Sequence, residues 1–181
     1  MAKIFKKSYD IKLPKSHHEA EEFTAKKGLV LCESCGAVYY KKHWHHNLER
    51  LNSPEVKSVS DVGKKDTSVK FLLCPACAMI KNKQYEGRII IQNVPKQIQK
   101  ELEELILGYG KRAYDRDPMH RLIEVNRNVP DLGKNVWQIT TTENQLANKL
   151  AKKIKSTFHQ AKSEVKFNAE PGNVAEIVIE F

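Results

Sequence analysis

No apolar run in this 181-residue sequence approaches the length of a membrane-spanning helix. The apolar runs, such as Phe71–Leu73 and Ile89–Ile91, are far shorter than the roughly 20 residues that a spanning helix needs. The first residues, MAKIFKKSYDIK, are basic but contain neither an apolar stretch nor a small-residue cleavage site, so they do not resemble a secretory signal. We therefore expect a cytoplasmic protein that does not enter a membrane.

The sequence signatures of several large enzyme classes are also missing. There is no glycine-rich phosphate loop, no H-E-x-x-H pair of metal-binding histidines and no G-x-S-x-G nucleophile turn. The segment from Asp115 to Arg121 mixes carboxylates with His120 and could in principle serve acid–base chemistry. Because a helix is expected to end there, capping and local ion pairs explain these residues more simply. We expect no enzymatic activity, no catalytic residues and no small-molecule substrate.

The composition is that of a folded, basic protein. Hydrophobic residues make up 40% of the chain and charged residues 29%, which permits a real core and argues against general disorder. The formal net charge is +9, and most of the excess lies in the N-terminal half. A basic excess favours a polyanionic partner, such as RNA, DNA or an acidic protein surface. Many soluble proteins are mildly basic without binding nucleic acid, so charge alone leaves the partner open.

Cysteine is scarce, and its four copies form two C-x-x-C pairs: Cys32 with Cys35, and Cys74 with Cys77. Two such pairs supply the four thiolates that a tetrahedral zinc ion takes in a closed, structural site. Two disulfides are not expected without a secretion signal, and a redox C-x-x-C would not need a matched second pair. Rubredoxin-like iron uses the same ligands. Zinc is favoured because nothing else in the sequence indicates electron transfer.

The residues around the cysteines predict a zinc ribbon, in which each C-x-x-C turn adjoins a strand. Gly36 suits a tight turn after the first pair, because glycine tolerates positive φ. The segment AVYYKK after it and the segment SVKFLL before the second pair are both strand-like. Residues 51–68, LNSPEVKSVSDVGKKDTS, are polar and aperiodic and indicate an inserted loop.

Basic and aromatic residues alternate beside the first cysteine pair. We expect Lys41, Lys42 and Lys70 to contact phosphates, with Trp44 and Tyr39 stacking on bases. Two alternatives remain. The aromatic rings could instead cover the small core of the ribbon, or His43 and His45, which would share one face of a strand, could hold a second metal ion.

The C-terminal half alternates strand and helix signals in the order β-α-β-β-α-β-β. Pro95 can open a first helix, which should end before Asp117 and Pro118. Thr142 and Gln145 have the spacing of a capping box that would open a second helix. The chain then ends in a hairpin. The first six elements match the split β-α-β arrangement of a ferredoxin-like fold, with both helices on one face of an antiparallel sheet.

The predicted organisation has three parts within an α+β fold. Residues 1–28 form a basic N-terminal arm, residues 29–85 a zinc ribbon with an inserted loop, and residues 86–181 a ferredoxin-like α+β domain. The lysines of the arm are interleaved with aromatic and aliphatic residues, as in basic arms that fold onto RNA. A solvated, flexible terminus is the alternative.

Four segments together resemble a group of small bacterial proteins that place two C-x-x-C turns before an α/β domain. These segments are LCESCGAVYYKKHW, LLCPACAMIKNKQYEG, RDPMHRLIEV and WQITTTENQLANKLAKKI. The group is distantly similar to the zinc-binding N-terminal region of the ribosomal-subunit export adaptor family. The resemblance implies zinc at Cys32, Cys35, Cys74 and Cys77 and a link to large ribosomal subunits or RNA. The resemblance covers residues 29–181, and it does not point to any particular activity.

Two functions follow as expectations. The first is a non-enzymatic zinc-ribbon protein that binds RNA or a ribosomal particle. The alternative is an assembly module that docks an acidic partner protein, with the basic charge serving solubility and steering.

Overall fold

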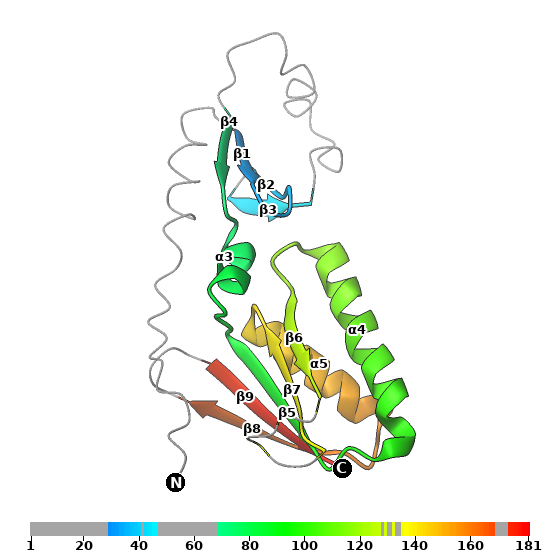
Figure 1. The fold of residues 1–181 in the computed structure, drawn as a ribbon. Coiled ribbons are helices and arrows are strands. Elements are labelled where there is room, and N and C mark those ends of the chain that lie inside the picture. Colours follow the sequence, from blue (N-terminus) through cyan, green and yellow to red (C-terminus); the bar gives the residue numbers. More distant parts are fainter. Residues whose placement is uncertain are drawn as a thin grey trace.

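The computed structural model describes residues 29–40, 42–46, 69–127, 129, 132, 135–168 and 174–181. The predicted basic arm, the predicted inserted loop and Lys41 lie outside the described residues. Within this part, the chain forms a four-stranded sheet, a five-stranded sheet and three α-helices (Figure 1). The predicted α+β class is therefore confirmed.

The four-stranded sheet belongs to an N-terminal unit, which we define as residues 29–46 and 69–81. Its strands are β1 (Leu29–Cys32), β2 (Val38–Tyr40), β3 (His43–His45) and β4 (Val69–Leu72), in the order β3-β2-β1-β4. Strand β4 pairs in parallel with β1, and the other neighbours are antiparallel. A short helix, α3 (Pro75–Lys81), follows β4 and leads directly to the second sheet (Figure 1).

The five-stranded sheet and two long helices form the C-terminal unit, residues 87–181. The strands are β5 (Gly87–Gln92), β6 (Leu122–Asn126), β7 (Trp137–Thr141), β8 (Lys162–Asn168) and β9 (Val174–Glu180), in the order β6-β7-β5-β9-β8. A 3-10 turn, η1 (Lys96–Ile98), precedes α4 (Gln99–Arg116), and α5 (Asn144–Thr157) joins β7 to β8.

The strand order departs from the predicted ferredoxin-like arrangement on one side of β5. A ferredoxin-like sheet would place the fourth strand, β8, beside β5 in antiparallel orientation. Instead β9 occupies that position, pairs in parallel with β5, and leaves β8 at the edge. The predicted β8–β9 hairpin is present, and its second strand is the one that pairs with β5. The sheet is therefore mixed rather than antiparallel.

Helices α4 and α5 cover one face of this sheet, as the apolar stripe of each helix predicts. Their inward residues pack on the alternate apolar residues of the three central strands. The buried members of this core include Leu102 and Ile106 from α4, Ala147, Leu150 and Ile154 from α5, and Ile89, Ile91, Trp137, Ile139, Ile177 and Ile179 from the sheet. Burial of one stripe on each helix leaves the remaining helix surface to solvent.

Helix α4 runs without a break to Arg116, although it contains Gly108 and Gly110. A Cβ at Gly110 would lie 2.3 Å from Leu122 Cδ1 of β6, so the missing side chain allows the helix to approach the sheet. Packing therefore offsets the low helix propensity of glycine at this position.

The predicted capping box at the start of α5 is wrong. The helix begins at Asn144, and its N-cap is Glu143, which makes no side-chain cap. Thr142 is only 2% exposed. Its hydroxyl donates to the Met119 carbonyl oxygen at 2.6 Å and accepts from the Arg121 amide at 2.9 Å. The Thr142 hydroxyl is therefore engaged in tertiary hydrogen bonds to the α4–β6 loop and does not cap α5.

The opposite face of the five-stranded sheet is partly polar, as the alternation along β9 predicts. Arg88 bridges three strands there, donating to Gln138 at 2.8 Å and pairing with Glu176 at 3.2 Å. Among the described helices, none combines the length and the apolar character that crossing a bilayer requires.

Candidate metal centre

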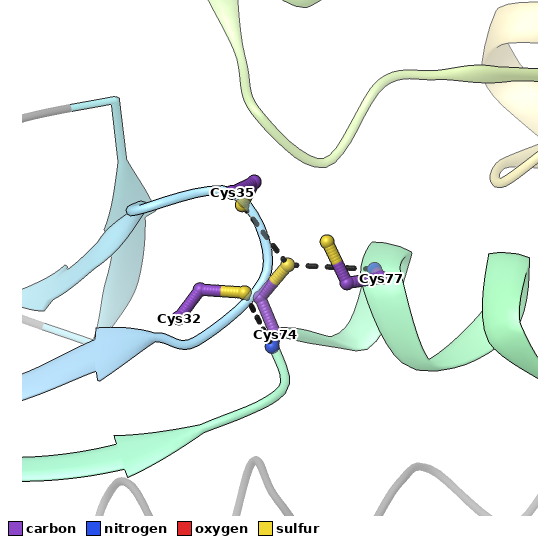
Figure 2. A group of neighbouring side chains, drawn as sticks. All are labelled: Cys32, Cys35, Cys74 and Cys77. Carbon is purple, nitrogen blue, oxygen red and sulfur yellow. Dashed lines mark hydrogen bonds between the residues drawn. The ribbon is translucent and has the colours of Figure 1, made fainter.

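The first cysteine pair lies in a turn at the end of β1. Cys32 donates its amide to the Ala37 carbonyl at 2.7 Å, and Gly36 donates to the Cys32 carbonyl at 2.9 Å. Gly36 has φ +71°, the left-handed value that the sequence predicted for this turn. The turn directs both sulfurs to the same side, toward the start of α3 (Figure 2).

The second pair follows a strand, as predicted, but begins a helix instead of forming a simple turn. Cys74 is the N-cap of α3, and its sulfur accepts the Cys77 amide at 3.4 Å. Pro75 stands at the first helical position, where its fixed φ and missing N–H suit a helix start. The unit is therefore a turn-and-helix site, and the strands predicted after the first pair and before the second are present as β2 and β4. Proline at this position, followed by Ala76 and Met79, is the sequence signal that would have predicted the helix.

The four sulfurs converge from segments that lie far apart in the sequence. All their ligand atoms lie within 4.8 Å of one another, and Cys35 Sγ lies 3.8 Å from Cys74 Sγ (Figure 2). In a tetrahedral site with zinc–sulfur bonds of 2.3 Å, the sulfurs are about 3.8 Å apart. Cys32, Cys74 and Cys77 are buried, and Cys35 is half-buried. The cluster therefore has the ligand set and the size of a closed four-thiolate metal site.

The electrostatics of the cluster also favour a cation. Hydrogen bonding to Cys74 lowers the pKa of the Cys35 thiol to about 4, with smaller help from the Ala37 backbone. The same contact, together with burial, raises the pKa of Cys74, and burial raises that of Cys77. One sulfur is thus stabilised as a thiolate by the protons of its neighbours. A divalent metal ion would supply the positive charge that lets all four sulfurs ionise.

Arg121 is the cationic side chain that reaches the sulfurs. Its Nη1 donates to Cys77 Sγ at 3.5 Å, its Nε donates to the Pro118 carbonyl at 2.8 Å, and its guanidinium carbon lies 4.7 Å from the centre of the Tyr114 ring. Its Nη2 is buried and has no hydrogen-bond acceptor among the described residues. Although burial alone would lower the pKa of Arg121, its cysteine neighbours raise it.

Sequence reasoning did not connect this arginine with the cysteines. Arg121 is 44 residues from Cys77 and belongs to the C-terminal unit. No local pattern marks a side chain that approaches through the tertiary fold.

The loop that bears Arg121 also joins the two units. Met119 packs against the buried cluster of the N-terminal unit, which includes Val30, Tyr39, Trp44 and three of the cysteines. Thr142 holds the backbone of the same loop from the C-terminal side. The metal centre is therefore enclosed by both units rather than carried on a separate module.

We expect Arg121→Gln to weaken metal binding without abolishing it. A four-thiolate zinc site carries excess negative charge, and removing an outer hydrogen-bond donor typically lowers metal affinity about 10–100-fold. Competition with a chromogenic zinc chelator measures this change. Arg116→Gln, which removes the same charge from a side chain with no sulfur contact, is the matched control, and an equal loss in both variants would refute a specific role for Arg121.

The residues predicted to contact nucleic acid do not form one surface. Tyr39 and Trp44 are 1% and 6% exposed, and their rings pack together with centroids 5.3 Å apart. Stacking on bases is incompatible with this burial, and the alternative, in which aromatic rings cover a small core, describes the packing. Lys42 is exposed and Lys70 is half-buried, whereas Lys41 lies outside the described residues.

The histidines beside Trp44 make backbone contacts. His45 Nε2 is 3.2 Å from the Tyr40 carbonyl oxygen, and His46 Nε2 contacts the Tyr114 carbonyl oxygen. Among the described residues, the four cysteines form the one group of potential ligands close enough to share an ion. The alternative of a second metal ion on the histidines therefore has no support in this part of the chain.

The acidic and histidine residues near the end of α4 have local partners. Asp117 Oδ1 accepts the Met119 amide at 2.8 Å, and His120 Nε2 lies 2.7 Å from Glu143 Oε2. These are the capping and ion-pair roles that the sequence favoured over acid–base chemistry.

Fold and site together define an α+β protein with a buried four-cysteine centre capable of holding a metal ion. No protein family, curated protein or solved structure matches this chain. The predicted resemblance to two-C-x-x-C bacterial proteins therefore stays a prediction.

Proposed function

We propose that this protein is a non-enzymatic, zinc-stabilised binding protein whose target is RNA, on its own or in a ribosomal particle. Zinc is favoured over other ions because the donor set consists of four thiolates in a compact arrangement. With all four ligand positions supplied by the protein, the ion would have no open position for water or substrate. Its role would then be structural.

The observation that supports an RNA partner is the exposed face of α5. This face carries Lys149, Lys152, Lys153 and Lys155, all exposed, and the helix contains neither aspartate nor glutamate. No recorded ion pair among the described residues involves these lysines. Positive side chains on adjacent turns repel one another, and a polyanion relieves that repulsion. The other face of the helix is buried in the core, so the lysines present a fixed, rigid stripe.

The proposed contact surface thus differs from the one that the sequence first suggested. Lysines of α5 replace the aromatic segment around Trp44 as the main contact. Because lysines contact phosphates rather than base edges, we expect binding with little sequence preference.

Binding to a single-stranded RNA oligonucleotide should weaken steeply with salt. For single strands, the slope of log K against log salt changes by about 0.7 for each neutralised phosphate. Fluorescence anisotropy at several salt concentrations measures this slope. Lys152→Gln with Lys153→Gln should reduce it by about 1.4, which is two phosphate contacts. Lys81→Gln with Lys96→Gln removes the same charge at exposed positions off α5 and should leave it nearly unchanged.

A protein partner is the competing outcome. Phe71 on β4 is 62% exposed, which is unusual for a large apolar side chain and could serve protein contact. Affinity capture from lysate with and without nuclease separates the two functions. Ribosomal RNA that disappears after nuclease treatment supports RNA binding. A single acidic protein retained after nuclease treatment, with no affinity for the RNA oligonucleotide, would refute it.

A further inference from the structure

A small pocket lies between α4 and α5, and cationic side chains surround it. Its volume is about 140 Å³, and its lining includes Arg112 and Arg116 of α4, Lys149 of α5 and His120 of the following loop. Ala113 and Leu146 contribute buried apolar surface to it. At roughly 30 Å³ for each water molecule, the pocket has room for about five. That is enough for a phosphate group and too little for a whole nucleotide.

The geometry of the helices directs these cations to one place. Arg112 and Arg116 are four residues apart and therefore lie on the same face of α4. This face borders α5, which contributes Lys149 one turn from its start. Two elements that are distant in the sequence thus supply three permanent positive charges to one pocket.

No recorded ion pair within the described part of the chain neutralises Arg112, Arg116 or Lys149. Asp117 also lines the pocket and accepts the Met119 amide at 2.8 Å, and Glu143 pairs with His120 at 2.7 Å. A backbone hydrogen bond leaves the charge of Asp117 in place, so the lining carries the three positive charges of Arg112, Arg116 and Lys149 against one negative charge. Three like charges held together are destabilising unless an anion lies between them. The excess of positive charge therefore selects an anionic ligand.

We propose that this pocket, the α4–α5 groove, is a phosphate-binding subsite that takes one phosphodiester group of an RNA backbone. The assignment rests on the proposed RNA-binding function for the source of the phosphate. Paired arginines suit this ligand because a guanidinium donates two parallel N–H groups to phosphate oxygens. The lysine stripe of α5 continues from Lys149 to Lys155 and would hold the adjacent phosphates of the same strand.

The test compares the zinc-loaded full chain with three variants. Arg112→Gln with Arg116→Gln removes the groove charges, and Lys81→Gln with Lys96→Gln is the control of equal charge. Arg116→Lys keeps the charge but replaces the planar guanidinium group with an ammonium group. In anisotropy titrations with the RNA oligonucleotide, the groove variant should bind about tenfold or more weakly and lose about 1.4 from the salt slope. The Arg116→Lys variant should weaken binding with the slope unchanged.

Circular dichroism and zinc content check that each variant is folded. If the groove variant and the control weaken RNA binding equally, the subsite proposal is refuted, whereas the proposed RNA-binding function is not.

A second measurement separates this proposal from the proposed function. Inorganic phosphate is titrated into isotope-labelled protein, and amide shifts are followed by NMR. Shifts at residues 112–120 and 149 that vanish in the groove variant support the subsite. If the wild type shows these shifts but does not bind the oligonucleotide, the ligand is free phosphate. No shift at these residues, together with no effect of the groove variant on RNA binding, overturns the subsite.

Discussion

Cys74→Ser should abolish zinc binding and unfold the N-terminal unit. Cys74 is fully buried and touches each of the other three cysteines. Its amide donates to Cys32 Sγ at 3.3 Å, its sulfur lies 3.8 Å from Cys35 Sγ, and it accepts the Cys77 amide at 3.4 Å. Serine keeps the helix cap but provides a hard, neutral oxygen in place of a thiolate. Metal content should fall from about one zinc per chain to near zero.

The loss of stability should be large and local. Binding of structural zinc contributes about 10–16 kcal/mol to the folding of small zinc-finger peptides. Three of the eight buried residues that form the core of the N-terminal unit are cysteines, so little apolar packing remains without the ion. The core of the C-terminal unit contains none of the cysteines and should persist.

Heteronuclear NMR spectra, combined with elemental analysis, measure both effects in one sample. Resonances of residues 29–46 and 69–81 should collapse toward random-coil positions, whereas those of β5, β7 and α5 should stay dispersed. Glu33→Gln changes an exposed residue within the same turn and should leave metal content and spectrum intact. Full zinc occupancy in Cys74→Ser would show that the cysteines are not the ligands.

Trp44→Ala should destabilise the N-terminal unit by about 3–5 kcal/mol, the usual cost of truncating a buried aromatic residue. Trp44 is 6% exposed and packs on Tyr39 across the β2–β3 pair. The variant should bind zinc more weakly because the turn-and-helix site loses its support. Trp44→Phe, which keeps a ring in the core, should lose markedly less stability.

Urea unfolding at saturating zinc, followed by circular dichroism, measures the change. RNA affinity, corrected for the folded fraction, distinguishes a role of Trp44 in core packing from a role in stacking on bases. A base-stacking role would lower RNA affinity in Trp44→Ala while stability and zinc content stay at wild-type values. That result would contradict the burial of this side chain and restore the aromatic segment as a contact surface.

Local patterns determined much of the secondary structure. Apolar periodicity predicted α4 and α5, and alternation predicted the strands and the β8–β9 hairpin, because each depends on side-chain spacing within one segment. The end of α4 before Asp117 and Pro118 was equally local, since proline excludes the residue before it from helix. Two features were not predicted. Thr142 bonds to a distant loop rather than capping α5, whereas the helix that Cys74 caps was missed although Pro75 marks it locally.

The four ligand residues of the metal centre could be named from the sequence alone. A C-x-x-C pair holds two sulfurs close together whatever the surrounding fold, so the chemistry of thiolates and their pairwise spacing was sufficient. The sequence by itself could not predict the contact of Arg121 with the cysteines, the burial of Trp44 and Tyr39, or the α4–α5 groove. Each of these depends on segments that meet only after folding.

The strand order was likewise decided by tertiary structure. The hydrophobic pattern of β9 showed which of its faces would be buried, but not that β9 would lie between β5 and β8. Every neighbour that covers Ala175, Ile177 and Ile179 satisfies that pattern equally well. Sequence therefore determined most of the elements, their inward faces and the four cysteines that could hold a metal ion, because these follow from the spacing of residues along one segment. Tertiary structure decided which segments meet, because that choice depends on the packing of the whole core.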